Sequence, residues 1–484
     1  MEQSPQGPGA GARPAARPAG RPARPNRKAM HASLWDGIWS SASENAMLPF
    51  IPMFALALGA GPAAIGLVAA FPTLLGNLFQ IPAARLAERF GHRRLYLLGS
   101  LGRLLWLPVA LLPFLDLPAD TAVALLIGLL SLRTAVISLA VPAWTTLMAQ
   151  AVPLRLRGRY FSNRNLYASL SALLAAASGG WLVRLAGYPA GYAALFGVAT
   201  LAGLLAVESV TRMPVEPLEP AHRPSHAPSS GPDHPPAEAA PQPHPPLSPG
   251  LHLGFGARLR AVTRAFRPDQ PFSRYILTSF AWTFAVNLPA PLFAVHFKQV
   301  LGGNEAIWGL TTATNLTVTM IGQRYWGRRT VTLGDRNIVI LGGLGASLLA
   351  LLWAVIPAPW YVFGLELLGG MAWSGYNLAA FTLLLRVLPP HNQAGRVAAY
   401  NTAVGLAAGL APMLGGFLVS FLGTRGMFLL SGTLRLVALA FFARAVQVPH
   451  TPPLRLGALR PQRGHLSRPL RLRPLWRPWI RPVR

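Results

Sequence analysis

The chain has 484 residues, of which 43 are Lys or Arg and 15 are Asp or Glu, giving a formal net charge of +28. Charged residues nevertheless make up only 12% of the chain and hydrophobic residues 52%. This balance excludes an ordinary soluble enzyme and a disordered protein and indicates a polytopic membrane protein. Cysteine is absent, which excludes disulfides, thiolate metal sites and cysteine nucleophiles. We do not interpret the basic charge as nucleic-acid binding.

Apolar runs long enough to cross a bilayer recur along most of the chain. About 20 helical residues span the hydrocarbon core, because each adds 1.5 Å. This length predicts an all-α protein with twelve transmembrane helices, at residues 35–58, 63–84, 95–115, 121–149, 160–185, 190–210, 275–297, 306–325, 338–356, 360–388, 397–422 and 427–445.

The predicted spans divide into two sets of six. We expect a basic N-terminal tail at 1–33, a six-helix half at 34–212, a linker at 213–273, a second six-helix half at 274–446 and an Arg- and Pro-rich tail at 447–484. The thirteen prolines between residues 214 and 249 preclude a packed core in the linker. Residues 255–266 have the pattern of an amphipathic helix in the membrane interface, or of a short helix leading into span seven.

Arginine placement predicts the orientation of the spans. The connections between spans two and three and between spans four and five are the basic ones, as is the linker. Basic connections are retained on the cytoplasmic side. We therefore expect a multi-pass protein of the cell membrane, plasma or bacterial inner, with both termini in the cytoplasm and the basic segments near anionic lipid headgroups.

The two halves repeat each other in sequence. Gly158-Arg159 matches Gly395-Arg396 at an offset of 237 residues, and Asn165 matches Asn401 at an offset of 236. The pair Gly179-Gly180 likewise matches Gly415-Gly416. Between spans two and three, Ala84 and Gly91 stand seven residues apart, as Gly327 and Gly334 do between spans eight and nine. This internal repeat predicts two pseudo-symmetric halves.

The loop after span two carries a recognisable motif. It reads Ala84-Arg85-Leu86-Ala87-Glu88-Arg89-Phe90-Gly91-His92-Arg93-Arg94. With the repeat, it resembles the loop signature of the major facilitator superfamily of secondary transporters, departing from it at Ala84 and His92. The resemblance implies two six-helix halves with a cytoplasmic linker. It also implies a conformational latch at Glu88, Arg89, Gly91 and Arg93. In the second copy Val331 and Thr332 replace the acid and the arginine.

Ionisable groups within membrane spans are expensive and mark candidate sites. In span ten Glu366, Gly370, Trp373 and Asn377 form one helical stripe, and in span four Arg133 begins a stripe with the same spacing. The repeat predicts that both stripes face one cavity, with Arg133 opposite Glu366. Arg133 would suit an anionic substrate group and Glu366 a proton or a cationic group. The alternative is a structural salt bridge between the two.

Span one and span seven share a proline pattern. Glu44 and Asn45 precede Pro49 and Pro52, and Asn287 precedes two prolines in span seven. Glu44 is the first candidate for a titrating group, with a neutral interhelical hydrogen bond as the alternative. Asn287 is a candidate for substrate contact or a hinge. We expect Asp36 at the interface or in a helix cap, and Arg103 and Arg435 to snorkel or pack.

These residues favour one function over two others. The leading hypothesis is secondary transport of a small-molecule substrate by alternating access, coupled to protons. The resemblance to the superfamily further implies an exporter. The alternative is a transporter-like scaffold or sensor that recruits partners through its basic tails. An enzyme is not expected, because no histidine, serine or carboxylate cluster indicates catalysis. No metal site and no cofactor is expected either.

Overall fold

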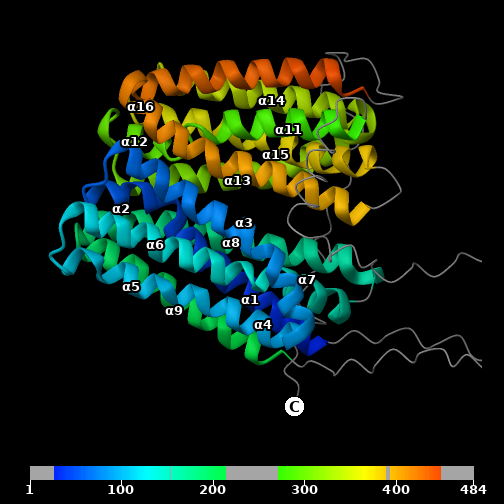
Figure 1. The fold of residues 1–484 in the computed structure, drawn as a ribbon, viewed down its shortest axis with the longest axis horizontal. Coiled ribbons are helices and arrows are strands. Elements are labelled where there is room, and N and C mark those ends of the chain that lie inside the picture. The colour runs from blue at the N-terminus through cyan, green and yellow to red at the C-terminus, as the bar shows by residue number, and fades with distance from the viewer. Residues whose placement is uncertain (1–26, 153, 214–270, 389–392, 448–484) are drawn as a thin grey trace, which may run out of the picture. The chain divides into compact units, whose positions relative to one another are not determined.

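The computed structural model describes residues 27–152, 154–213, 271–388 and 393–447 (Figure 1). Within these ranges the chain is helical throughout, without strands. Residues 1–26, 214–270 and 448–484, which make up most of the predicted tails and linker and contain the amphipathic segment, lie outside the described residues, so the structure does not test the hypothesis of a scaffold acting through its tails. Residues 27–33, predicted as tail, belong to the first helix. The chain divides into two compact units, Met1–Ala60 with Phe71–Pro243, and Gly61–Ala70 with His244–Arg484.

The described part of the first half forms nine α-helices and three short 3-10 helices. In chain order these are α1 (Arg27–Met47), η1 (Leu48–Phe50), α2 (Ile51–Ala57), α3 (Pro62–Phe90), α4 (His92–Ser100), η2 (Leu101–Leu105), α5 (Trp106–Leu111), η3 (Leu112–Phe114), α6 (Ala119–Ser138), α7 (Ala140–Ala151), α8 (Leu154–Ala186) and α9 (Ala190–Thr211). The expected first span is thus interrupted by η1, which contains Pro49, as a residue without a backbone N–H predicts.

The second half of the chain forms α11 (Pro271–Asn287), α12 (Leu292–Gln299), α13 (Glu305–Leu333), α14 (Asp335–Trp353), α15 (Tyr361–Val387) and α16 (Gln393–Ala445). Within this unit α11 and α14 each pack against α16 (Figure 1). The long α16 is interrupted at Gly423, whose φ of 65° is not helical. Because Gly423 lies between the expected spans eleven and twelve, the interruption corresponds to the connection that the sequence predicts there.

Eight helical stretches among the described residues are long and apolar enough to cross a membrane. The helices that fall short of this criterion, α1, α13 and α15, cover the expected spans one, eight and ten, and α16 is counted once for two spans. The expected number of twelve is therefore not confirmed. The shortfall has a physical reason, because polar residues lower the hydropathy of these helices, among them Asp36 and Glu44 in α1, Asn315 and several threonines in α13, and Glu366 and Asn377 in α15.

Matched backbone contacts extend the sequence repeat into three dimensions. Arg93 donates to the Thr211 carbonyl at 2.9 Å, and Arg336 donates to the Ala443 carbonyl at 2.5 Å. The donors are 243 residues apart and the acceptors 232. The glycines that precede these arginines, Gly91 and Gly334, have positive φ angles of 87° and 76°. Each half thus begins its third predicted span with the same glycine turn and the same arginine tie.

A second matched contact connects the helix that precedes the proline break in each half, α1 or α11, to a neighbouring helix. Ser43 of α1 donates to the Ala199 carbonyl of α9 at 2.7 Å. In the second half the direction is reversed, since Ser431 of α16 donates to the Ala285 carbonyl of α11, also at 2.7 Å. The pairs are related by offsets of 242 and 232 residues. The two units therefore share one helix arrangement, in which the serine donor and the carbonyl acceptor have changed places between the two helices.

Candidate functional site

The first unit contains an ion pair between α1 and α6. Arg133 of α6 donates from Nη2 to a carboxylate oxygen of Glu44 on α1. The Arg133 guanidinium also lies over the Trp106 ring, 3.8 Å from its centroid. Arg133 is buried and Glu44 is half-buried. The arginine is thus held by a carboxylate on one side and an aromatic face on the other, which is a favourable site for a desolvated cation.

The second unit contains a carboxyl group with a neutral partner. Asn315 of α13 donates from Nδ2 to Oε2 of Glu366 on α15 at 2.7 Å. Thr319, one turn along α13, completes the polar group, 3.5 Å from Asn315 Oδ1. No basic side chain among the described residues forms an ion pair with Glu366. Glu366 and Glu44 therefore have different environments, since only Glu44 has a cation beside it.

The predicted facing of Arg133 and Glu366 stays a prediction, because the two residues belong to different units. Within its own unit Arg133 pairs with Glu44, and within the other unit Glu366 bonds to Asn315. The long side chain of Arg133 allows it to reach α1 from α6. Sequence reasoning considered Glu44 and Arg133 separately, because periodicity places residues along a helix but does not say which neighbouring helix a long side chain reaches.

Asp36 forms a buried cluster that the sequence did not predict. Its carboxylate accepts hydrogen bonds from Tyr96 at 2.6 Å and Ser40 at 3.1 Å, and lies 3.4 Å from the Arg164 guanidinium. Asp36 does not cap a helix, because it lies inside α1 with only 1% of it exposed, and a position at the depth of the membrane interface stays a prediction. Gly37 makes the cluster possible, because a Cβ there would lie 2.8 Å from the Arg164 guanidinium carbon.

The two candidate asparagines bond within their own helices. Asn45 donates to the Ser41 carbonyl at 2.9 Å and Asn287 to the Thr283 carbonyl at 2.8 Å. Asn45 stands four residues before Pro49, and Asn287 is the last residue of α11, two residues before Pro289. This matched arrangement supports a role at the break, and the hinge hypothesis for Asn287 stays a prediction.

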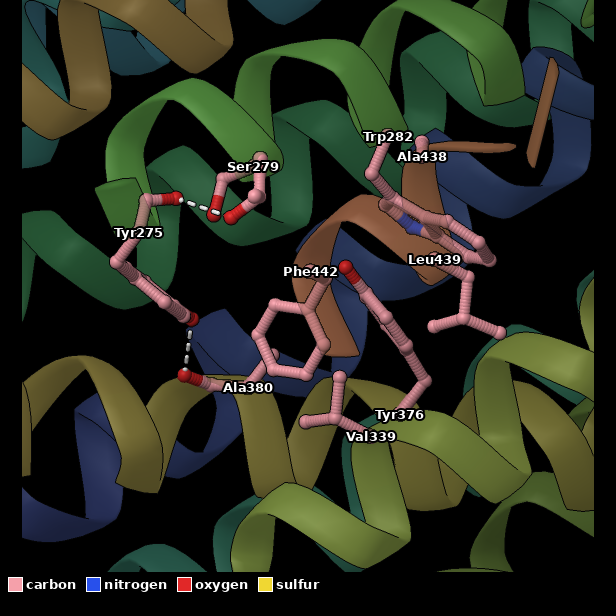
Figure 2. A pocket seen from close by; sticks show the side chains of 10 residues that line it. Tyr275, Ser279, Trp282, Val339, Tyr376, Ala380, Ala438, Leu439 and Phe442 are labelled. Carbon is pink, nitrogen blue, oxygen red and sulfur yellow. Dashed lines mark hydrogen bonds between the residues drawn. The ribbon is translucent and has the colours of Figure 1, made fainter. Parts of the chain in front are cut away.

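Trp373, the third residue of the predicted stripe on α15, belongs to an aromatic cluster. The Trp373 ring packs edge-on against Trp282 and Tyr376, while Trp282 and Tyr376 stack with centroids 4.7 Å apart. Asn377, the next stripe residue, is exposed. The cluster borders a small cavity within the second unit, where the Tyr275 hydroxyl donates to the Ala380 carbonyl at 2.7 Å (Figure 2). Every residue that lines this cavity is uncharged.

The predicted latch loop makes one interhelical tie that the structure describes. Arg93 bonds to the end of α9, as given above, whereas Arg89 is exposed and lies over the neighbouring Phe90 ring at 5.5 Å. The side chain of Glu88 lies outside the described part of the chain. A latch role for Glu88, Arg89, Gly91 and Arg93 stays a prediction. Among the described residues no group of three or more metal-ligating side chains is present.

Comparison with known families decides the identity of the fold. The family model described as Major Facilitator Superfamily matches residues 37–313 and 275–483. The chain belongs to the major facilitator superfamily. As the resemblance of the loop motif and the half-repeat predicted, it is therefore a multi-pass membrane protein of a secondary transporter family.

A curated relative in this superfamily shares part of the sequence. The Multidrug resistance protein MdtG of Klebsiella pneumoniae (strain 342) is 24% identical over 161 residues, which is 32% of this chain and 39% of the relative. The match thus spans less than half of that protein, so it does not by itself transfer an activity.

Solved structures of the superfamily share the fold. The nucleoside transporter NupG is 12% identical and has a TM-score of 0.60, covering 87% of this chain and all of its own. A bacterial homologue of the human lysosomal transporter Spinster, inward-facing and occupied, is 15% identical with a TM-score of 0.63, covering 87% of this chain and 97% of its own. A POT family transporter in complex with a thioalcohol-conjugated peptide has a TM-score of 0.59 at 13% identity, covering 87% of this chain and 96% of its own.

Proposed function

We propose that this superfamily member is a proton-coupled exporter of small organic solutes, located in the cell membrane with both termini in the cytoplasm. Export and a drug-like substrate class are supported by the similarity to a multidrug resistance protein. Orientation is supported by the basic connections of the sequence. Proton coupling is supported by the environment of Glu366, and that observation carries the proposal.

Glu366 has the features of a proton carrier in a membrane protein. Its carboxyl group accepts a hydrogen bond from the neutral Asn315 amide and has no ion-pair partner among the described residues. In apolar surroundings the negative charge of a carboxylate is unfavourable when no cation lies beside it, and protonation removes this charge. Loading and release of a proton would then change the charge of α15, which is how a proton gradient can bias a transport cycle.

Glu44 is the second proton-coupling candidate. It is charge-compensated by Arg133, so protonation of Glu44 would release the arginine instead of removing an isolated charge. Arg133, once released, would offer its guanidinium to an anionic substrate group. The two acids thus predict different phenotypes. Loss of Glu366 should remove coupling, whereas loss of Glu44 should also change substrate preference.

Transport in vesicles with an imposed pH gradient tests the proposal. Purified protein is reconstituted in liposomes, and a panel of fluorescent drug-like amphiphiles is screened for uptake that requires the gradient. For any substrate found, Glu366→Gln should abolish gradient-driven accumulation while preserving downhill exchange. The matched control Glu208→Gln changes an exposed acid at the end of α9, whose ion-pair partner among the described residues is Arg212, and should transport normally.

A ligand screen by thermal unfolding at two pH values gives an independent measurement. A substrate that binds the folded protein raises its Tm by mass action. We expect the shift in Tm to depend on pH in the wild type and to lose that dependence in Glu366→Gln.

In the vesicle assay, normal gradient-driven accumulation by Glu366→Gln would refute the assignment of coupling to this residue.

A further inference from the structure

The 3-10 helix η2 places three buried donor groups on one face. A 3-10 helix has three residues per turn, so side chains three residues apart are eclipsed. Ser100, Arg103 and Trp106 have this spacing across η2. In the described structure Oγ of Ser100, Nε and Nη1 of Arg103 and Nε1 of Trp106 are buried and have no hydrogen-bond acceptor. Buried polar groups without partners are rare and indicate an unseen ligand or solvent.

The charges around this face do not balance. Asp36 pairs with Arg164 and Glu44 pairs with Arg133. Arg103 is 8% exposed and forms no ion pair with any described residue. A buried guanidinium that lacks a counter-ion is strongly unfavourable. The surplus in this part of the first unit is thus one positive charge.

A second arginine adjoins the same face. Arg133 lies over the ring of Trp106, and its Nε is also buried without an acceptor. The backbone is close as well, since a Cβ built on Gly102 would lie 3.2 Å from the Arg133 carbonyl oxygen. Arg103 and Arg133 thus both carry buried N–H donors without an acceptor among the described residues. The open nitrogens of Arg103, Arg133 and Trp106 can only donate, and the Ser100 hydroxyl can also donate. Such a set favours an anion over a cation.

The equivalent arginine of the second unit also has no ion-pair partner among the described residues and leaves its Nε without an acceptor, but backbone carbonyls accept from both of its terminal nitrogens. With the offsets of the matched contacts, Arg103 corresponds to Ala346 and Gly203 to Arg435. Arg435 is buried and donates to the Ala346 carbonyl at 2.7 Å and to the Val286 carbonyl at 3.3 Å. In the first unit the arginine is on the opposite helix of the pair, facing Gly203, and has no such carbonyl acceptor among the described residues.

We propose that the first unit binds a small monovalent anion, chloride in the cell, against Arg103 and the face formed by Ser100, Trp106 and Arg133. The anion supplies both the missing negative charge and the missing acceptor, which a water molecule cannot do. It would stabilise the packing of η2 against α6 and α9. The site does not include Glu366, whose environment carries the proposed proton coupling, although it shares Arg133 with the ion pair of Glu44.

Thermal unfolding of the full chain in detergent tests the anion site. Sodium chloride is titrated against sodium gluconate at constant ionic strength, because gluconate is too large for a buried monatomic site. We expect a saturable rise in Tm of about 3 °C or more in chloride, as mass action requires for a ligand of the folded state. Arg103→Gln should lose this rise, and Arg103→Lys, which keeps the charge without Nε and Nη1, should weaken the apparent affinity about tenfold.

The matched control is Arg435→Gln, which removes the equivalent buried arginine of the second unit. It should keep the full chloride-dependent rise in Tm even if its starting Tm is lower. A rise that persists in Arg103→Gln, or no difference between chloride and gluconate in the wild type, would overturn the proposal. If Arg103→Gln does not fold, bromide bound to wild-type crystals decides the matter, since its anomalous signal must lie beside Arg103 and a signal only elsewhere refutes the site.

Discussion

The ion pair between Glu44 and Arg133 should respond unequally to the loss of its two members. The Arg133 side chain is 5% exposed and the Glu44 side chain 24%. A guanidinium keeps its charge under all accessible conditions, whereas a carboxylate that reaches solvent can be neutralised by a proton. Glu44→Gln therefore leaves a buried cation without a counter-ion. Arg133→Met leaves an acid that can become neutral and a side chain of similar length beside Trp106.

The magnitude follows from the contacts that remain in each variant. Removal of one member of a buried ion pair lowers stability by about 3–5 kcal/mol. In Glu44→Gln the stacking of Arg133 on Trp106 at 3.8 Å persists, so the loss should be at the lower end of this range. In Arg133→Met the stacking is lost, which costs up to about 2 kcal/mol when desolvated, and a contact of the Met sulfur with the Trp106 ring regains about 1 kcal/mol of it. We therefore expect losses near 3 kcal/mol for Glu44→Gln and near 1 kcal/mol for Arg133→Met. At about 2–4 °C per kcal/mol, the Glu44→Gln loss corresponds to a decrease in Tm of roughly 6–12 °C.

Thermal unfolding of the purified protein in detergent, followed by tryptophan fluorescence, measures both variants and the double variant. The double variant should be close to Arg133→Met alone, because the amide that replaces the Glu44 carboxylate then leaves no cation unpaired. Equal losses in the two single variants, or losses that add in the double variant, would refute the reasoning. Either result would mean that the pair is not coupled in the way its unequal burial implies.

Two further stability predictions use the same assay. A Cβ on Gly415 would overlap the carbonyl oxygen of Leu288, so Gly415→Ala should lower stability by about 1–3 kcal/mol. At the control position Gly364 a Cβ would have nothing within 4 Å, so Gly364→Ala should be neutral or raise stability by up to about 1 kcal/mol. Similar losses in both variants would contradict the steric argument. Asp36→Asn should lower stability by about 3 kcal/mol, because it leaves buried donors around an uncharged amide. The control variant Glu208→Gln, at an exposed acid, should change stability by less than about 0.5 kcal/mol. An Asp36→Asn variant as stable as that control would show that the Asp36 cluster contributes little.

The positions of glycine turns and helix breaks are the part of the fold that could be predicted from the sequence. The break between spans eleven and twelve is at Gly423, and the glycine turns at Gly91 and Gly334 recur with the spacing of the repeat. Pro49 lies in the 3-10 helix that interrupts the first predicted span. These features were accessible because glycine and proline act on the local backbone, whatever the surrounding structure.

The candidate acids were also predicted, but their order of importance changed with their partners. Glu44 was the first candidate for a titrating group because it precedes a proline break. In the structure Glu44 has a cation beside it and Glu366 has only an amide. The environment of a carboxyl group depends on residues more than fifty positions away in sequence, and no local pattern contains that information.

The sequence by itself determined that the chain is a membrane protein, that it consists of two related halves and which few polar groups it places inside apolar helices. The tertiary structure decided which of these groups meet: Arg133 with Glu44, Asp36 with Tyr96 and Arg164, and Arg103 with no counter-ion among the described residues. The physical reason is that helical spacing fixes one face of each helix, whereas the rotation of that helix against its neighbours and the reach of a long arginine are set only by packing.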